Sequence, residues 1–144
     1  MASGTFYPAA ATDDGSWVTG QSISYGLGYA RFGDYVGNPW NSFFRFVNVT
    51  IPAEATITSA VIQFTSYGND SGTTVLSEVA FYDIDDAEAG DCPTTAQDGT
   101  DLLAALTTGV TWDGLGSWVD GTDYDTPSLV SSLQEVIDRP GWAT

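Results

Sequence analysis

The sequence predicts an all-β fold, an antiparallel β-sandwich with one short C-terminal α-helix. Ser, Thr and Gly supply 47 of the 144 residues, which suits short strands joined by many turns. Asp outnumbers Glu by 15 to 4, and Asp favours turns and caps whereas Glu favours helix interiors. Hydrophobic residues make up 42% of the chain, which is too many for a disordered acidic chain and enough for one domain with a core.

Three segments in the middle of the chain have the clearest strand patterns. Residues 42–51 are rich in Phe and Val, and residues 56–67 and 74–85 alternate between two faces. In the second segment the face with Ala60, Ile62 and Phe64 is the more apolar, so we expect it to be buried. Short turns separate the three segments, which predicts an antiparallel sheet.

The flanking segments complete the single domain. Residues 1–20 predict an N-terminal arm or first strand, and residues 21–144 predict the β-sandwich. Residues 83–100 are acidic and loop-like. Residues 101–108 predict a short helix, and two short strands are expected at residues 110–112 and 117–119.

The clearest helix spans residues 127–138. Thr126 is a suitable N-cap, and Pro127 fits the first helical position. Apolar residues then recur at helical spacing and form one stripe, which we expect to cover an open end of the sandwich. The stripe consists of Leu129, Val130, Leu133, Val136 and Ile137.

The charge balance excludes several classes of function. The chain has 19 acidic residues and 3 Arg, with no Lys and no His, so its net charge is −16. So few cations cannot neutralise a nucleic-acid backbone, and an anionic membrane would repel the chain. Without His there is no Ser-His-Asp triad and no usual zinc site. We therefore expect no nucleic-acid partner, no membrane partner and no enzyme activity.

Cysteine content and the N-terminal residues bear on the compartment. The lone Cys92 allows no internal disulfide, and no His is present to activate its thiol. Residues 1–5 lack the basic and apolar regions of a signal peptide. We therefore expect a chain made in the cytoplasm.

Residues 25–40 interleave aromatic residues with glycines. The segment is no dinucleotide fingerprint, because Arg31 occupies the place of the third glycine. Two interpretations stay open: the aromatic side chains pack on the core, or they form a contact surface for a sugar or a neighbouring subunit. The same choice between core and sugar stacking holds for the five tryptophans, which are Trp17, Trp40, Trp112, Trp118 and Trp142.

Two acidic groups are candidate calcium sites, because calcium takes oxygen ligands. The first consists of Asp83, Asp85, Asp86, Glu88 and Asp91, and the second of Asp120, Asp123 and Asp125. The spacing of the first does not fit an EF-hand loop, and a solvated acidic loop explains either group as well. Close pairs of carboxylates are inevitable among 19 acids, so they do not indicate a glycosidase.

Residues 44–64 resemble a hairpin of jelly-roll β-sandwich modules. They contain Ile51-Pro52-Ala53-Glu54-Ala55-Thr56-Ile57-Thr58-Ser59-Ala60, and the modules have "I-P-x-G-A-T-I-T-S-A". The chain is similar in this to domains of the DNRLRE type and to small structural proteins of tailed phages. Thr5-Phe6-Tyr7-Pro8 and the close at residues 128–142 also resemble the phage proteins. Glu54 departs from the pattern, since it stands where the modules have Gly, which predicts a turn of another type.

The resemblance implies a jelly-roll fold and a non-enzymatic role in a virion. We expect a capsid decoration (cement) protein on the virion surface. Its partners would be the major capsid protein or another virion protein, and it would form a homo-oligomer, with a trimer expected. The expected subunit and shell contacts are aromatic: Phe6, Tyr7, Tyr25, Tyr29, Phe32, Tyr35 and Trp40. No catalytic residue and no cofactor comes with the resemblance, and calcium is the one ion considered.

Two other functions stay open. A glycan-binding module, such as the receptor-binding tip of a tail fibre, would need exposed aromatic side chains in a groove. A bacterial surface adhesion module would need export, which residues 1–5 do not indicate.

The net charge predicts that stability depends on salt. With 19 acids and 3 cations, repulsion between carboxylates opposes the compact state, and we expect most acids to lie in turns and loops. Salt screens such repulsion beyond about 8 Å at 0.15 M. The melting temperature should therefore rise as NaCl is increased from a few mM. A melting temperature that stays constant across this range would contradict the prediction.

Overall fold

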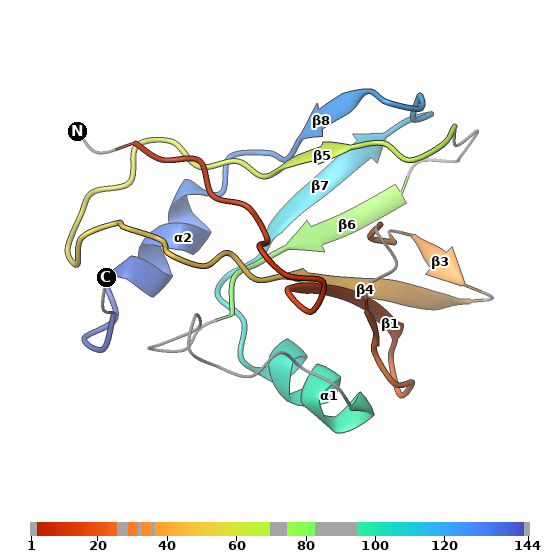
Figure 1. Cartoon of the computed structure of the whole chain (residues 1–144), viewed down its shortest axis with the longest axis horizontal. Coiled ribbons are helices and arrows are strands. Elements are labelled where there is room, and N and C mark those ends of the chain that lie inside the picture. The colour runs from red at the N-terminus through yellow and green to blue at the C-terminus, as the bar shows by residue number, and fades with distance from the viewer. Residues whose placement is uncertain are drawn as a thin grey trace.

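The structure is a computed structural model that describes residues 3–25, 29–31, 33–35, 37–69, 75–82 and 95–142. Its largest sheet has four antiparallel strands in the order β2-β1-β4-β3 (Figure 1). β1 (Asp14–Val18) and β4 (Asn38–Phe44) form its centre. The edges are β2 (Ser24–Tyr25) and β3 (Asp34–Tyr35).

Two smaller antiparallel sheets complete the strands. β5 (Gln63–Thr65) pairs with β8 (Asp123–Asp125), and β6 (Val75–Val79) pairs with β7 (Val110–Leu115). The molecule is therefore all-β, with antiparallel sheets and two short helices, as the sequence predicts. The jelly-roll arrangement stays a prediction.

The extents of the strands differ from those expected. The strand expected at residues 42–51 is the end of β4 and stops at Phe44. The strand expected at residues 56–67 pairs with another strand only at residues 63–65. The third covers residues 75–79. The strand expected at residues 110–112 extends to Leu115 as β7, and residues 117–119 form no strand. The expected alternation in the second segment is confirmed: Ala60, Ile62 and Phe64 are half-buried, whereas Val61 is 54% exposed.

Aromatic rings connect the three sheets. The ring centroids of Phe44 in β4 and Phe64 in β5 lie 5.2 Å apart, and those of Phe64 and Trp112 in β7 lie 5.9 Å apart. Trp118 extends the series to Tyr124 in β8, with which it stacks at 4.4 Å. Side-chain packing thus joins sheets that share no backbone ladder among the described residues.

Helix α1 (Ala96–Ala104) packs on the four-stranded sheet. Thr95 and Asp98 form a capping box, in which each side chain accepts a hydrogen bond from the other residue's backbone N–H. Gly99 is buried against Trp17, and a Cβ there would lie 2.7 Å from the indole nitrogen. The expected helix at residues 101–108 is therefore wrong in its bounds, because the capping box starts the helix earlier.

Helix α2 (Val130–Ile137) is shorter than predicted, and Thr126 is not its N-cap. Thr126 is buried and binds the extended chain before β5, since its hydroxyl accepts a hydrogen bond from Ile62 N. The predicted apolar stripe is confirmed, with Leu129, Val136 and Ile137 almost fully buried. Two tryptophans, Trp17 and Trp112, are buried as the core interpretation requires.

Several acids lie in strands, although most were expected in turns and loops, including the loop expected at residues 113–125. Glu78 is in β6, Asp113 in β7, and Asp123 and Asp125 in β8. All four are exposed. The acidity therefore coats the outward faces of strands as well as turns, because period-2 alternation lets one strand face be charged while the other packs inward.

Asp13 is a buried carboxylate that ties the start of β1 to the end of β4. It is 1% exposed and accepts hydrogen bonds from Ala9 N, Ala10 N and the guanidinium of Arg45. Burial by itself raises the pKa of Asp13. The hydrogen bonds from Arg45 and the two amides, with the charge of Arg45, outweigh burial and hold the pKa below its usual value.

The substitution Asp13→Asn should destabilise the protein at neutral pH. A carboxyl with a lowered pKa stabilises the fold above its unfolded pKa of 3.8, and this contribution disappears as the pH falls through the folded pKa. We expect a loss of roughly 1.5–3 kcal/mol at pH 7, the range for hydrogen bonds to charged groups. The difference from wild type should shrink below about pH 4 in urea denaturation. Asp14→Asn removes the same charge nearby and is the control; an equal effect of the two would refute the prediction.

Glu54 adopts a backbone conformation that favours glycine. Its φ is 61°, in a turn where Ala55 N donates to Pro52 O over 3.1 Å. Glu54 therefore occupies the left-handed conformation that Gly adopts readily. A side chain in this left-handed region costs about 1–2 kcal/mol.

Glu54→Gly should accordingly stabilise the protein by roughly 0.5–1 kcal/mol, since relief of strain exceeds the extra entropy of Gly in the unfolded chain. Denaturant midpoints measure the change. Glu54→Gln removes the charge and keeps the strain, and Ala53→Gly adds flexibility alone. If Glu54→Gly is no more stable than Glu54→Gln, the strain is absent.

Candidate functional site

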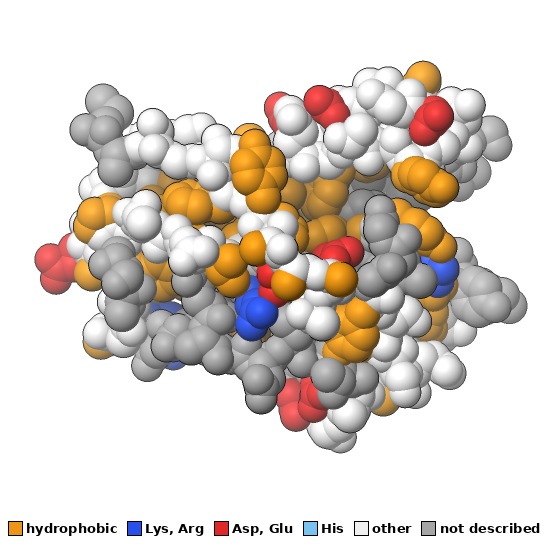
Figure 2. Space-filling model, viewed as in Figure 1, with side chains coloured by type: hydrophobic (Ala, Val, Ile, Leu, Met, Phe, Trp, Pro, Cys, Tyr) orange, Lys and Arg blue, Asp and Glu red, His pale blue; other side chains and the backbone are white. Residues whose placement is uncertain are grey.

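An apolar cleft separates the four-stranded sheet from the β5–β8 sheet and α2. Its volume is about 2080 Å³. Extended segments of chain, residues 39–46, 55–65 and 77–82, form much of its lining. In the space-filling view hydrophobic side chains line the hollow between the upper and lower parts of the molecule (Figure 2). The described core does not fill the space between the sheets.

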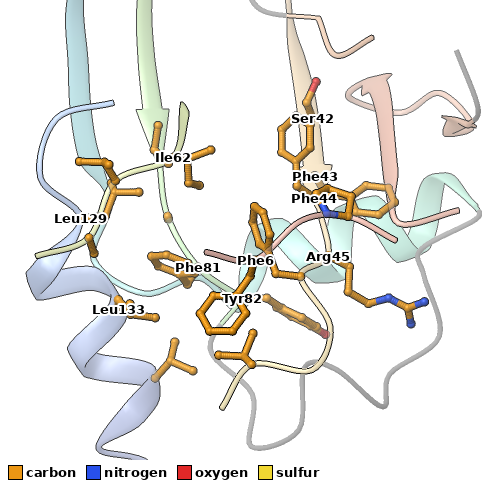
Figure 3. Close-up of a pocket in the computed structure, with 18 of the residues that line it drawn as sticks. Phe6, Ser42, Phe43, Phe44, Arg45, Ile62, Phe81, Tyr82, Leu129 and Leu133 are labelled. Atoms are coloured by element: carbon orange, nitrogen blue, oxygen red, sulfur yellow. The ribbon is translucent and has the colours of Figure 1, made fainter. Parts of the chain in front are cut away.

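The N-terminal arm contributes one aromatic side chain to this cleft. The ring of Phe6 reaches into the lining near Phe44, Phe81 and Tyr82 (Figure 3). Phe6 is half-buried, while the other residues from Ser3 to Pro8 are exposed. Tyr7 beside it is 71% exposed.

A second group of aromatic residues surrounds Arg31. The guanidinium carbon of Arg31 lies 4.5 Å from the ring centroid of Trp40 and 5.3 Å from that of Tyr29. Its Nη2 donates a hydrogen bond to the Tyr29 hydroxyl over 3.0 Å. Tyr29 in turn stacks on Tyr67 with parallel rings 5.5 Å apart. We call Tyr29, Arg31, Trp40 and Tyr67 the arginine–aromatic cluster.

The centre of the large sheet holds the cluster in place. Ser16 in β1 and Ser42 in β4 are register partners, with their hydroxyl oxygens 2.8 Å apart. Arg31 N donates to both hydroxyls, and the Ser42 hydroxyl donates to Arg31 O over 2.8 Å. Trp40 lies on the same face of β4 as Ser42, two residues away. The rigid ladder thus positions both Trp40 and the backbone of Arg31.

The cluster has an unusual electrostatic position. No carboxylate among the described side chains lies within 4 Å of the Arg31 guanidinium. Arg45, by contrast, is paired with Asp13. In a chain of net charge −16, Arg31 presents a cation that contacts rings and a hydroxyl, so its remaining N–H groups can meet an acceptor from outside.

The expected contact residues fall into three groups. Tyr29 and Trp40 come together in the cluster. Tyr25 packs edge-on against Phe43 at 6.3 Å and lines the cleft, so it belongs to the core side. Phe6 and Tyr7 lie on the arm. Phe32 lies outside the described residues, as does the side chain of Tyr35 in β3.

Two members of the cluster, Arg31 and Tyr67, are missing from the set predicted from sequence. The one sequence feature that could have drawn attention to Arg31 is that it is one of only three cationic residues in the chain. Tyr67 is 83% exposed at the end of the extended segment that contains β5. Its contact with Tyr29 joins residues 38 positions apart, and nothing in local sequence indicates it.

The second acidic group makes cross-strand contacts. Asp123 accepts a hydrogen bond from the Thr65 hydroxyl over 2.7 Å, and Asp125 accepts one from Gln63 over 2.9 Å. Asp120 accepts one from Gly68 N. Within the described ranges no three such side chains converge as a metal site would require. The calcium candidates Asp83, Asp85, Asp86, Glu88 and Asp91 lie outside the described residues.

Comparison with known proteins does not place the chain in a family. No family model, curated protein or solved structure matches it. The resemblance to DNRLRE-type domains and tailed-phage proteins therefore stays a prediction from the sequence motifs. No helix in the described part of the chain is long and apolar enough to cross a membrane.

The arrangement of the cluster is suited to binding. Trp, Tyr and Arg are the residues most enriched in binding hot spots. Each cation–π contact contributes about 0.5–1 kcal/mol at an exposed site, and more when a partner removes water from it. Because the sheet already holds Trp40 and the backbone of Arg31, a partner would spend less entropy in ordering them.

Proposed function

We propose that this chain is a non-enzymatic structural protein of a tailed-phage virion, a capsid decoration protein that binds the shell and neighbouring subunits. The resemblance of residues 44–64 and 128–142 to structural proteins of tailed phages supports the virion role. The arginine–aromatic cluster is the observation that carries the binding role, since it is ordered, partly exposed and made of hot-spot residues.

The proposal assigns an orientation in which the arginine–aromatic cluster faces the shell. Arg31 is the one charge of the cluster and would meet an acceptor there. Asp120 and Asp123 lie beside Tyr67, since they accept hydrogen bonds from Gly68 N and the Thr65 hydroxyl, and they would stay solvated at the rim of the contact.

The proposal is tested first on particles. Mass spectrometry of purified virions from the phage that encodes the chain should detect it, and electron cryomicroscopy should place it outside the shell. Absence from purified virions would overturn the proposal. Density inside the tail tube would exclude the decoration role.

Binding to particles that lack the protein then tests the cluster. Trp40→Ala should weaken binding by about 2 kcal/mol, or roughly 30-fold, because it removes the ring under Arg31. Val119→Ala is the matched control, because Val119 is an exposed apolar residue outside the cluster with 55% exposure. Equal binding by both variants would show that another surface makes the contact.

A glycan-binding module is the second candidate. The observation that favours it is Tyr67, whose ring is 83% exposed and already stacked on one side, so the other side is free for a sugar. Arg31 nearby would bind a carboxylate on an acidic sugar. A glycan array should then show binding to acidic sugars that Tyr67→Ala abolishes and Tyr7→Ala preserves. No binding to any glycan would exclude this candidate.

A further inference from the structure

We propose that the N-terminal arm exchanges between copies of this chain, with Phe6 of one copy occupying the apolar cleft of another. The proposal concerns copies of the chain alone and does not depend on a virion role. Its basis is the way in which the arm occupies the cleft of its own chain.

Residues 3–8 of the arm lie along the cleft, and Phe6 is the one of them that is half-buried. Phe6 reaches into the cleft near Phe81 and Tyr82, while its neighbours from Ser3 to Pro8 remain exposed (Figure 3). No hydrogen bond joins residues 3–8 to the rest of the described chain. The arm of a second copy can therefore replace it without breaking any ladder, and it makes the same contacts.

The cleft offers more space than the arm fills. It has a volume of about 2080 Å³ with Phe6 in place, and extended chain forms its sides at residues 39–46 and 55–65. The arm therefore lies along an open groove and is not enclosed by it, so it can leave the groove and an identical arm can enter.

The arm is the part of the chain that can approach a second copy with the least electrostatic repulsion. Two bodies of net charge −16 repel each other. Residues 3–12, however, contain no charged side chain. Residues 3–8 precede the amides that Asp13 binds and span at most about 20–22 Å when extended, so exchange brings the two bodies close together and requires salt to screen their repulsion.

The exit of the arm is a fixed hinge. Asp13 binds the amides of Ala9 and Ala10 and is itself held by Arg45, which fixes where the arm leaves the body. Residues before this point change direction without disturbing β1. Exchange then requires the arm to move and leaves the four-stranded sheet intact.

The test is a photo-cross-link between isotopically distinct chains. A photoreactive p-benzoylphenylalanine replaces Phe6 in ¹⁵N-labelled chains, which are refolded with an equal amount of unlabelled wild type in 0.5 M NaCl and irradiated. Cross-linked peptides that join a labelled arm to unlabelled residues near Phe44, Phe81 or Tyr82 are expected. Links found only within labelled chains, in a monomer, would overturn the proposal, as would an oligomer whose arms link only to their own clefts.

Sedimentation of point variants provides an independent measurement. Phe6→Ala should weaken self-association by on the order of 10-fold or more, because it removes the docked ring. Tyr7→Ala is the matched control, because Tyr7 is the next residue and is 71% exposed. This variant should self-associate with an affinity within about 2-fold of wild type. Self-association that Phe6→Ala leaves unchanged would overturn the proposal. The assay contains no virion, so its failure is distinct from failure of the proposed function.

Discussion

The buried carboxylate of Asp13 is the constraint on which the order of the molecule depends. A charge with 1% exposure is tolerated only when every oxygen is satisfied, and here Arg45 and two amides satisfy it. The backbone carbonyl of Asp13 also accepts Arg45 N, which continues the β1–β4 pairing by one step. One residue therefore sets the first strand, the last residues of its partner and the exit of the arm.

The same pair of strands orders the arginine–aromatic cluster. The hydroxyls of Ser16 and Ser42 hold the backbone of Arg31, and Trp40 supports its guanidinium from the next position on that face. The β1–β4 ladder and the partly exposed cluster therefore depend on the same residues of the two strands. Side chains that are ordered before binding are what a contact surface requires, and a loop alone would not supply them.

Local patterns predicted the fold class, the buried face around Ile62 and the apolar stripe of α2, because each depends on side-chain alternation or helical spacing within one segment. They failed where a distant partner decides the outcome. Thr126 has the sequence context of an N-cap, yet its hydroxyl binds Ile62 N, 64 residues earlier. Among the described residues, the strands between residues 42 and 82 pair with β1, β7 and β8 and not with one another. Turn length could not indicate this.

The candidate site could be predicted from the sequence only where its residues lie close together along the chain. Tyr29 and Trp40 were expected as contacts because aromatic residues are dense in their segment. Tyr67 joined them only through the tertiary fold, and Arg31 was visible only as a rare charge. Phe6 was expected on an outer surface, and the structure places its ring in the cleft of its own chain. Sequence indicates which side chains are suited to contact, and the fold decides what they contact.

The aromatic rings that connect the three sheets have a mechanical consequence. Backbone ladders fix strands at a definite register, but the rings of Phe44, Phe64 and Trp112 meet without directional bonds. Such contacts impose no register, so the packing of these rings, and not backbone hydrogen bonding, sets how the sheets lie against one another. The angle between the sheets therefore depends on the size and shape of these three side chains.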